Sequence, residues 1–181
     1  YEGPIKVTET TDFTFCTFRP NGKKGDIVKT PFIKSEYTPS ETAAPSNPGL
    51  RATWHEFKGN KCSEIEKAPV NGTYPVEDVM IPKKVKGNIG LIIKGYFNAP
   101  QDDIYTFALL SDDGSTLTID SEQIVDNDGP HGPKEIVGQK ALAKGYHPME
   151  LRYFDQNGGQ LKLKVTGSDG KEIPFTHLYA H

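Results

Sequence analysis

Two adjacent aspartates are the residues whose type and spacing most directly suggest chemistry. The segment Ser111-Asp112-Asp113-Gly114-Ser115 lies between two stretches of strand-forming residues. In an extended trans backbone, neighbouring side chains point to opposite sides, so one shared site requires an unusual backbone such as a cis peptide bond. A hard cation such as calcium would offset the repulsion between the two carboxylates and use their oxygens as ligands. The alternative is a polar hairpin turn, since aspartate and glycine are common turn residues.

A second oxygen-rich loop runs from Asp126 to Pro133 and offers Asp126 and Asn127 as candidate ligands. If Gly129 took the sixth position of a calcium-binding EF-hand loop, Ile124 would stand at the first ligand position. Prolines also interrupt the loop, and neither flank has a helical period. An EF-hand is therefore excluded, and a solvent-facing turn is the alternative to a ligand loop.

A third loop, from Asp155 to Gly159, contains the oxygen-bearing side chains of Asp155, Gln156 and Asn157. It closes a predicted hairpin. If this hairpin and the one that carries Asp112 and Asp113 end at the same pole of a sandwich, the two loops approach each other.

Motifs for nucleophilic, metal-dependent or nucleotide-dependent catalysis are missing from the sequence. The chain has no G-x-S-x-G, H-E-x-x-H, G-x-x-x-x-G-K or G-x-G-x-x-G, and its histidines lack metal-ligand spacing. Adjacent aspartates also lack the separation of about 5 Å or more that glycosidase carboxylates use. Four aromatic side chains are candidates either for stacking on sugar rings or for the core, Trp54, Tyr96, Tyr146 and Tyr153.

Composition excludes two classes of partner. Lysine and arginine (21) do not outnumber aspartate and glutamate (24), and no long basic run exists, so nucleic-acid binding is not expected. Apolar runs fall far short of the ~20 residues of a membrane-spanning helix. Because the chain starts at Tyr1 without methionine, we expect it to be a segment of a longer protein. Cys16 and Cys62 either pair or remain free thiols.

Strand signals separated by turns recur along most of the chain, and this rhythm predicts an all-β, antiparallel sandwich or barrel. Lysines at alternate positions from Leu161 to Val165 indicate a strand with one solvent-facing side. Residues 60–67 are expected to form one helical turn. The predicted strands are Leu50–Lys58, Ile89–Phe97, Ile104–Leu110, Thr116–Asp120, Ile136–Ala141, His147–Phe154 and Leu161–Val165.

The first 34 residues predict a separate, small strand segment. Alternation from Phe13 to Phe18, the turn signal Pro20-Asn21-Gly22-Lys23 and a returning strand within Asp26–Ile33 indicate a hairpin. Residues 35–48 lose this alternation and collect prolines, which predicts a linker. We therefore expect three parts, at residues 1–34, 35–48 and 49–181.

Four segments of the third part resemble the fourteen-kilodalton protective-antigen (PA) domain family. This resemblance implies a β-sandwich of the kind found in glycosidases, adhesins and other secreted proteins. The segments that carry it are Gly49–Trp54, Ile104–Phe107 with Ser111–Asp120, Ala143–Tyr153 and Ile173–Tyr179.

The resemblance also implies a calcium site. In the flocculin and epithelial-adhesin branch of that family, two adjacent aspartates joined by a cis peptide bond bind calcium, which coordinates sugar hydroxyls. Asp112 and Asp113 match these aspartates, and Asp155 holds the place of an asparagine that completes the site. The adhesins' longer sugar-contacting loop is replaced by the compact residues 156–159. The expected metal ligands are Asp112, Asp113 and Asp155, and the expected glycan-binding residues are Gln156, Asn157, Asp126 and Asn127.

The leading segments Tyr1–Asp12 and Thr17–Lys23 resemble the last strands of the small β domain that follows the catalytic domain in chitobiase-type β-hexosaminidases. Together, the two resemblances imply a non-catalytic, carbohydrate-binding accessory module of a secreted, periplasmic or cell-surface glycoside hydrolase. Its partners would be a glycan and the parent's catalytic domain. The alternatives are a structural or protein-interaction spacer and, less in keeping with the residues, an autonomous hydrolase.

Overall fold

A computed structural model describes all residues except 1–2, 43–46, 157, 175–177 and 181. The chain divides into two compact units, Tyr1–Glu36 and Tyr37–His181. No helix in the described ranges is long and apolar enough to cross a membrane.

The first unit is the hairpin expected from its turn signal. Strands β1 (Thr11–Phe18) and β2 (Lys24–Phe32) pair antiparallel, with Phe13 opposite Thr30. The turn between them is closed by the Arg19 N–H donating to the Lys23 carbonyl at 2.9 Å. Gly22 has a φ of 74°, which glycine adopts without a steric penalty. On one face Phe13 packs against Phe32, with ring centroids 5.3 Å apart.

This hairpin has little core of its own. Phe18 is 68% exposed, and Phe15 and Ile33 also stand largely in solvent. Within the described residues, β1 and β2 form a sheet of two strands only. A two-stranded hairpin is at best marginally stable in water.

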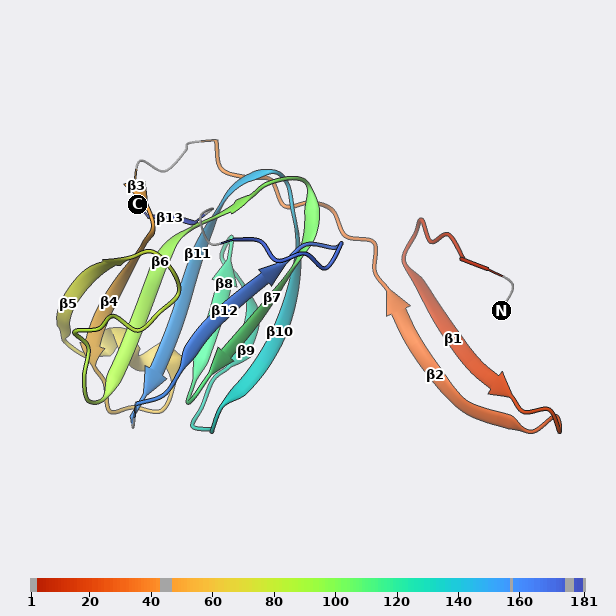
Figure 1. Ribbon diagram of the computed structural model, residues 1–181, viewed down its shortest axis with the longest axis horizontal. Coiled ribbons are helices and arrows are strands. Elements are labelled where there is room, and N and C mark those ends of the chain that lie inside the picture. The colour runs from red at the N-terminus through yellow and green to blue at the C-terminus, as the bar shows by residue number, and fades with distance from the viewer. Residues whose placement is uncertain (1–2, 43–46, 157, 175–177, 181) are drawn as a thin grey trace. The chain divides into compact units, whose positions relative to one another are not determined.

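The second unit is the expected antiparallel β-sandwich, built from a small and a large sheet (Figure 1). The small sheet has the order β10-β7-β12, and its strands are β7 (Asp103–Ser111), β10 (Lys134–Leu142) and β12 (Leu161–Thr166). The large sheet has the order β3-β13-β6-β11-β8-β9, with β4 added beside β6 and β5 beside β4. Its strands are β3 (Asn47–Pro48), β4 (Leu50–Glu56), β5 (Val70–Val76), β6 (Ile89–Ala99), β8 (Ser115–Ile119), β9 (Glu122–Asn127), β11 (Gly145–Asp155) and β13 (Leu178–Ala180).

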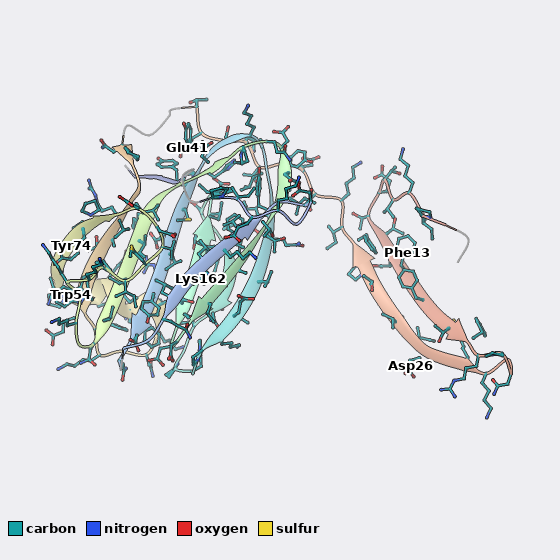
Figure 2. The ribbon with its side chains drawn as sticks, viewed as in Figure 1. Phe13, Asp26, Glu41, Trp54, Tyr74 and Lys162 are labelled. Atoms are coloured by element: carbon teal, nitrogen blue, oxygen red, sulfur yellow. The ribbon has the colours of Figure 1, made fainter. Side chains whose placement is uncertain are left out.

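The core lies between the two sheets and follows the two-residue period of the strands. Tyr105, Phe107 and Leu109 of β7 point inward and are fully buried. Lys162 and Lys164 of β12 are exposed, as the alternation predicted; Figure 2 labels Lys162 on this strand. Burial of apolar side chains at about 25 cal/mol per Å² is the main stabilising contribution of this layer.

The outer face of the large sheet, which points away from this core, carries a second small apolar cluster. Phe154 follows Tyr153 on β11, so its side chain points to the opposite side of the sheet. There it meets Phe57 edge-on, with ring centroids 5.7 Å apart, and packs with Ile65 of the 3-10 helix η1 (Cys62–Lys67). The helical turn expected near residues 60–67 thus covers one end of this outer face.

Two elements differ from the sequence-based expectation. Strand β5 was not expected because it contains Gly72 and Pro75, which are rare inside sheets. Among the strands of the described ranges it pairs with β4 alone, and an edge strand tolerates proline. Within the expected linker, Thr38 accepts from the Ala143 N–H at 2.9 Å and Glu41 donates to the Tyr146 carbonyl at 2.8 Å. Residues 38–41 are therefore attached to the sandwich.

Both cysteines are free thiols. Cys16 lies in the first unit and Cys62 is buried in the second. Burial raises the pKa of the Cys62 thiol, and the nearby Asp128 carboxylate raises it further. Because the thiolate is the reactive form, Cys62 is an inert core residue.

Candidate functional site

The candidate site is built around the turn between β7 and β8, which carries Asp112 and Asp113. No cis peptide bond occurs in the described part of the chain, so the bond between these aspartates is trans and the expected cis bond is wrong. The backbone is unusual in a different way, because Asp113 has a φ of 57°. Aspartate is among the few residue types that tolerate this left-handed region.

Asp113 connects three loops by hydrogen bonds. Its Oδ1 accepts from the backbone N–H of His131 at 3.2 Å, and its Oδ2 accepts from the backbone N–H of Gln156 at 3.3 Å. Its own N–H donates to the His131 carbonyl at 2.8 Å. The neighbouring Asp112 N–H donates to the Gln160 carbonyl at 3.0 Å. The β7–β8, β9–β10 and β11–β12 loops therefore meet at one pole of the sandwich, as expected for the first and third of them.

The three predicted metal ligands lie around one buried phenol. Burial raises the pKa of Tyr153, and the charges of Asp155, Asp112 and Asp113 raise it further. The backbone at Gly159 shows how closely these groups approach each other. A Cβ on Gly159 would lie 2.6 Å from the Asp112 Cβ, 3.1 Å from the Tyr153 hydroxyl and 3.2 Å from the Asp155 carboxyl carbon. Only glycine fits at this position without a shift of its neighbours.

In the present arrangement, two of these three carboxylates accept hydrogen bonds from backbone N–H groups. Among the residues that the structure describes, no group of three histidine, cysteine, aspartate or glutamate side chains is placed to hold a metal ion. Both oxygens of Asp113 accept backbone N–H groups. Asp155 Oδ2 accepts from the Gly159 N–H at 2.5 Å. The sequence thus predicted which acids gather, but the calcium ion itself stays a prediction.

Asp112 differs from the other two carboxylates. Its side chain is half-buried, and within the described residues no group donates a hydrogen bond to its carboxylate. Asp112 is therefore a candidate acceptor at this pole for a hydroxyl or a cation.

The predicted glycan-binding residues divide into three groups. Gln156 lies at the pole, where its Nε2 donates to the Gly59 carbonyl at 3.0 Å. Asn157 lies outside the described residues. Asn127 is 2% exposed, and its Nδ2 donates to Ser111 Oγ and to the Lys134 carbonyl, each at 3.0 Å. Asn127 is therefore buried, because strand β9 directs its side chain inward, and its contact with a glycan stays a prediction.

Asp126, one position earlier, points to the other side of β9. It is exposed and lies opposite Thr116 of β8. Its Oδ1 accepts from the Asp128 N–H at 3.1 Å. The structure therefore places Asp126 on the outer face of the large sheet and does not bring it to the carboxylates at the pole.

The sequence did not single out two residues that shape the pole, His131 and Tyr153. The His131 ring has its Nε2 2.9 Å from the Asn127 carbonyl and its Nδ1 2.8 Å from the Gly132 carbonyl. These ring contacts lie within the β9–β10 loop, and the backbone N–H and carbonyl of His131 attach this loop to Asp113. Tyr153 is expected to be either a stacking platform or a core residue, and the structure places it in the core beside the three aspartates. No local pattern marks either role, because each depends on contacts between loops far apart in the chain.

The four aromatic residues that are candidates for stacking on sugars are buried or half-buried. Tyr96 and Tyr153 are buried, so neither ring presents a face to solvent. Trp54 is half-buried on β4, near Tyr74 of β5; Figure 2 labels both residues. Tyr146 is also half-buried.

Comparisons with known proteins agree with this architecture. A family model described as the PA14 domain matches residues 46–175. The PA14 sugar-binding domain from an RTX adhesin shares 16% identity at a TM-score of 0.64, over 75% of this chain and 99% of that one. The epithelial adhesin 9 A domain from Candida glabrata, in complex with Galβ1-3GlcNAc, shares 12% identity at a TM-score of 0.56, over 78% and 93% of the two chains.

A third solved structure, the β-glucosidase from Kluyveromyces marxianus in complex with glucose, shares 17% identity at a TM-score of 0.53. The similarity covers 66% of this chain and 16% of that one. No curated protein sequence is significantly similar to the chain. At these identities, the likeness to solved structures establishes the fold alone.

Proposed function

The chain belongs to the PA14 domain family, and from this premise we propose that its sandwich is a non-catalytic module that binds carbohydrate at the pole around Asp113. The observation that carries the proposal is the convergence of three loops on the Asp113 carboxylate. A sugar-binding domain of an adhesin and an adhesin solved with a disaccharide share this fold, which supports the same ligand class here.

The chemistry of the pole suits a polyhydroxylated ligand. Asp112 offers a half-buried carboxylate with no donor bound to it in the described structure. Hydrogen bonds from sugar hydroxyls to an ionised acceptor are shorter and stronger than those to neutral groups. Asp113 serves as a positioning residue, because its bonds to the β9–β10 and β11–β12 loops hold these loops beside Asp112.

Calcium dependence is the finer part of the proposal. Asp112, Asp113 and Asp155 bring three negative charges close to Tyr153, and a bound cation would reduce their mutual repulsion. Because both Asp113 oxygens already accept N–H groups, binding an ion would require the turn to rearrange. We therefore expect calcium to bind more weakly than at a preformed site.

The parent protein is proposed to be a secreted, periplasmic or cell-surface glycoside hydrolase of the β-N-acetylhexosaminidase type. The occurrence of this fold within a β-glucosidase supports a hydrolase parent. The sequence resemblance of the first unit to the domain that follows the catalytic domain in chitobiase-type enzymes supports the finer class. The catalytic domain of the same chain would then be the partner of this module.

The test is binding of the 181-residue chain to an array of neutral and N-acetylhexosamine-containing glycans. We expect retention of a defined set of glycans, and loss of that retention in Asp112→Ala with the fold preserved by circular dichroism. Asp169→Ala is the matched control, because Asp169 is an exposed aspartate outside the pole. Absence of retention, or equal retention by Asp112→Ala, contradicts the proposal.

A structural or protein-interaction spacer is the second candidate, and one observation favours it. The first unit exposes Phe15, Phe18 and Ile33, and exposed apolar groups of this kind are typical of contact surfaces. A spacer predicts no glycan retention at all. It also predicts that substituting these apolar residues weakens association with the catalytic domain.

A further inference from the structure

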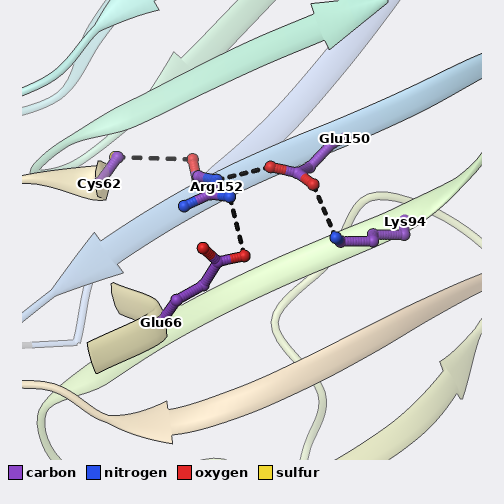
Figure 3. A network of polar contacts seen from close by, with 5 residues as sticks. All are labelled: Cys62, Glu66, Lys94, Glu150 and Arg152. Carbon is purple, nitrogen blue, oxygen red and sulfur yellow. Dashed lines mark hydrogen bonds and ion pairs between the residues drawn. The ribbon is translucent and has the colours of Figure 1, made fainter. Parts of the chain in front are cut away.

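The outer face of the large sheet carries a network of charges that the proposed pole does not use (Figure 3). Arg152 of β11 donates through Nε to Glu150 Oε1 at 2.6 Å and through Nη2 to Glu66 Oε1 at 3.0 Å. Glu150 Oε2 lies 2.8 Å from Lys94 Nζ. Partial burial opposes ionisation of Glu150, but hydrogen bonds from Lys94 and Arg152 outweigh it and lower the pKa of that carboxyl. Glu150 is thus firmly ionised at neutral pH.

This network fixes the plane of the Arg152 guanidinium. Two carboxylates hold Nε and Nη2, and the side chain is 20% exposed. In the described part of the chain, nothing accepts a hydrogen bond from the third nitrogen, Nη1. An arginine held in this way loses little side-chain entropy when it binds a further acceptor.

Beside Arg152 lies a depression of about 330 Å³. Strand register places its polar side chains in two rows across β11, β8 and β9. Arg152 lies opposite Thr116, which lies opposite Asp126, and Glu150 lies opposite Thr118, which lies opposite Gln123. Ser63 and Asp128 complete the polar lining. Its volume is at the small end of the range for ligand sites, about 300–1,000 Å³.

The lining defines a class of ligand. Threonine and serine hydroxyls, the Gln123 amide, carboxylates and one guanidinium together offer both donors and acceptors, as a polyhydroxylated ring requires. Asp126, Asp128 and Glu150 outnumber Arg152, so an anionic ligand is disfavoured. A metal ion is also disfavoured, because no three ligands are suitably placed among the described residues.

We propose that this depression, the lateral site, is a second saccharide site that prefers an amino sugar with a free ammonium group. The ammonium would pair with Asp126, whose carboxylate is exposed at the rim, and the ring hydroxyls would bind Arg152 Nη1 and the Thr116 and Thr118 hydroxyls. The lateral site and the pole have in common only the class of ligand that is proposed for them, a saccharide. Asp126 lies on the outer face of the large sheet, opposite Thr116, and is not among the residues that meet at the pole.

The test is a titration of the 15N-labelled 181-residue chain with three probes that differ in charge, D-glucosamine, D-glucose and D-glucuronate. The signals followed are the amides of Thr116, Thr118 and Gln123 and the Arg152 Nε–H. We expect glucosamine to shift these signals at the lowest concentration, glucose to follow, and glucuronate to bind about tenfold more weakly than glucosamine, the difference that one charged contact makes. No shift at these residues with any probe overturns the proposal.

Two isosteric variants separate the lateral site from the pole. Asp126→Asn removes the rim charge but keeps the oxygen that accepts from the Asp128 N–H. It should abolish the preference for glucosamine over glucose at the lateral signals. Asp112→Asn changes the pole and should leave the lateral signals unaffected. If glucosamine shifts only pole amides such as those of Asp113 and Gln156, the lateral site is refuted while the proposed function stands.

Discussion

Both units of this chain have strands with alternating apolar side chains, but the sandwich buries these side chains far more completely than the hairpin does. In the sandwich, Phe107 points between two sheets, is fully buried, and packs edge-on against Phe97 with ring centroids 5.4 Å apart. In the hairpin, Phe15 alternates in the same way and stacks on Phe13 at 5.6 Å, but remains 48% exposed. Alternation of apolar residues thus specifies a strand, but the strand is stabilised only when a second layer packs against its apolar face.

The largest expected effect tests this contrast directly. Phe107→Ala should lower the free energy of unfolding of the sandwich by about 3–5 kcal/mol, because it leaves a cavity in a close-packed core. Phe15→Ala should change it by less than about 0.5 kcal/mol, as for other solvent-exposed positions. Urea unfolding followed by near-ultraviolet circular dichroism measures both. Similar losses for the two variants would show that the hairpin and sandwich unfold as one cooperative unit.

A second prediction is that the stability gained on calcium binding is a property of the sandwich alone. Calcium at a hundred times its dissociation constant should stabilise the chain by about 2.7 kcal/mol. Residues 37–181 without the hairpin should show the same gain in a thermal unfolding experiment. Asp112→Asn should remove the gain with little change in calcium-free stability, since its carboxylate accepts no hydrogen bond in the described structure. An unchanged gain in this variant would place the cation elsewhere.

A third prediction concerns crowding within the sandwich pole. Gly159→Ala should cost about 1–3 kcal/mol, because the added methyl group would lie 2.6 Å from the Asp112 Cβ. Gly132→Ala is the control, since a Cβ there meets nothing within 4 Å. Thermal unfolding of the two variants compares them. Equal melting temperatures would mean that the β11–β12 loop moves freely away from Asp112.

The smallest expected effect is on the pH dependence of the free energy of unfolding of the sandwich. The pKa of Glu150 is lowered in the folded state, so its contribution to stability is complete above the ordinary glutamate pKa of about 4.3 and is lost as pH falls through the lower, folded value. Glu150→Gln should flatten the stability curve in this acidic range, by less than about 1 kcal/mol. Denaturant unfolding between neutral and acidic pH measures the slope. An unaltered slope would show that other carboxylates dominate it.

Local pattern predicted most strands, and the exceptions have physical causes. Alternation at Tyr105, Phe107 and Leu109 identified a strand because the large sheet packs against one face of β7 and buries these side chains. Strand β5 lacked this signal, since an edge strand accepts glycine and proline. Residues 38–41 resembled a linker because their attachment to the sandwich uses backbone groups, which carry no side-chain signature.

The site was predictable in its composition and not in its geometry. The acidic character of Asp112, Asp113 and Asp155 and the hairpin that carries Asp155 indicated which loops could meet. The peptide between the aspartates is trans, however, and the left-handed φ of Asp113 turns its carboxylate toward two backbone N–H groups. Asn127 and Asp126, equivalent by residue type as oxygen ligands, were separated by the pleat of β9.

Alternation, turn residues and charge are local properties, so the sequence was enough to predict an all-β chain and the acids of the pole. Only the tertiary structure decided which oxygens remain available and that Arg152, Thr116 and Asp126 form a row on the outer face. These outcomes depend on register and on contacts between distant loops. Strand register and loop contacts are not encoded in the spacing of residues along one strand, because both depend on a second segment of the chain.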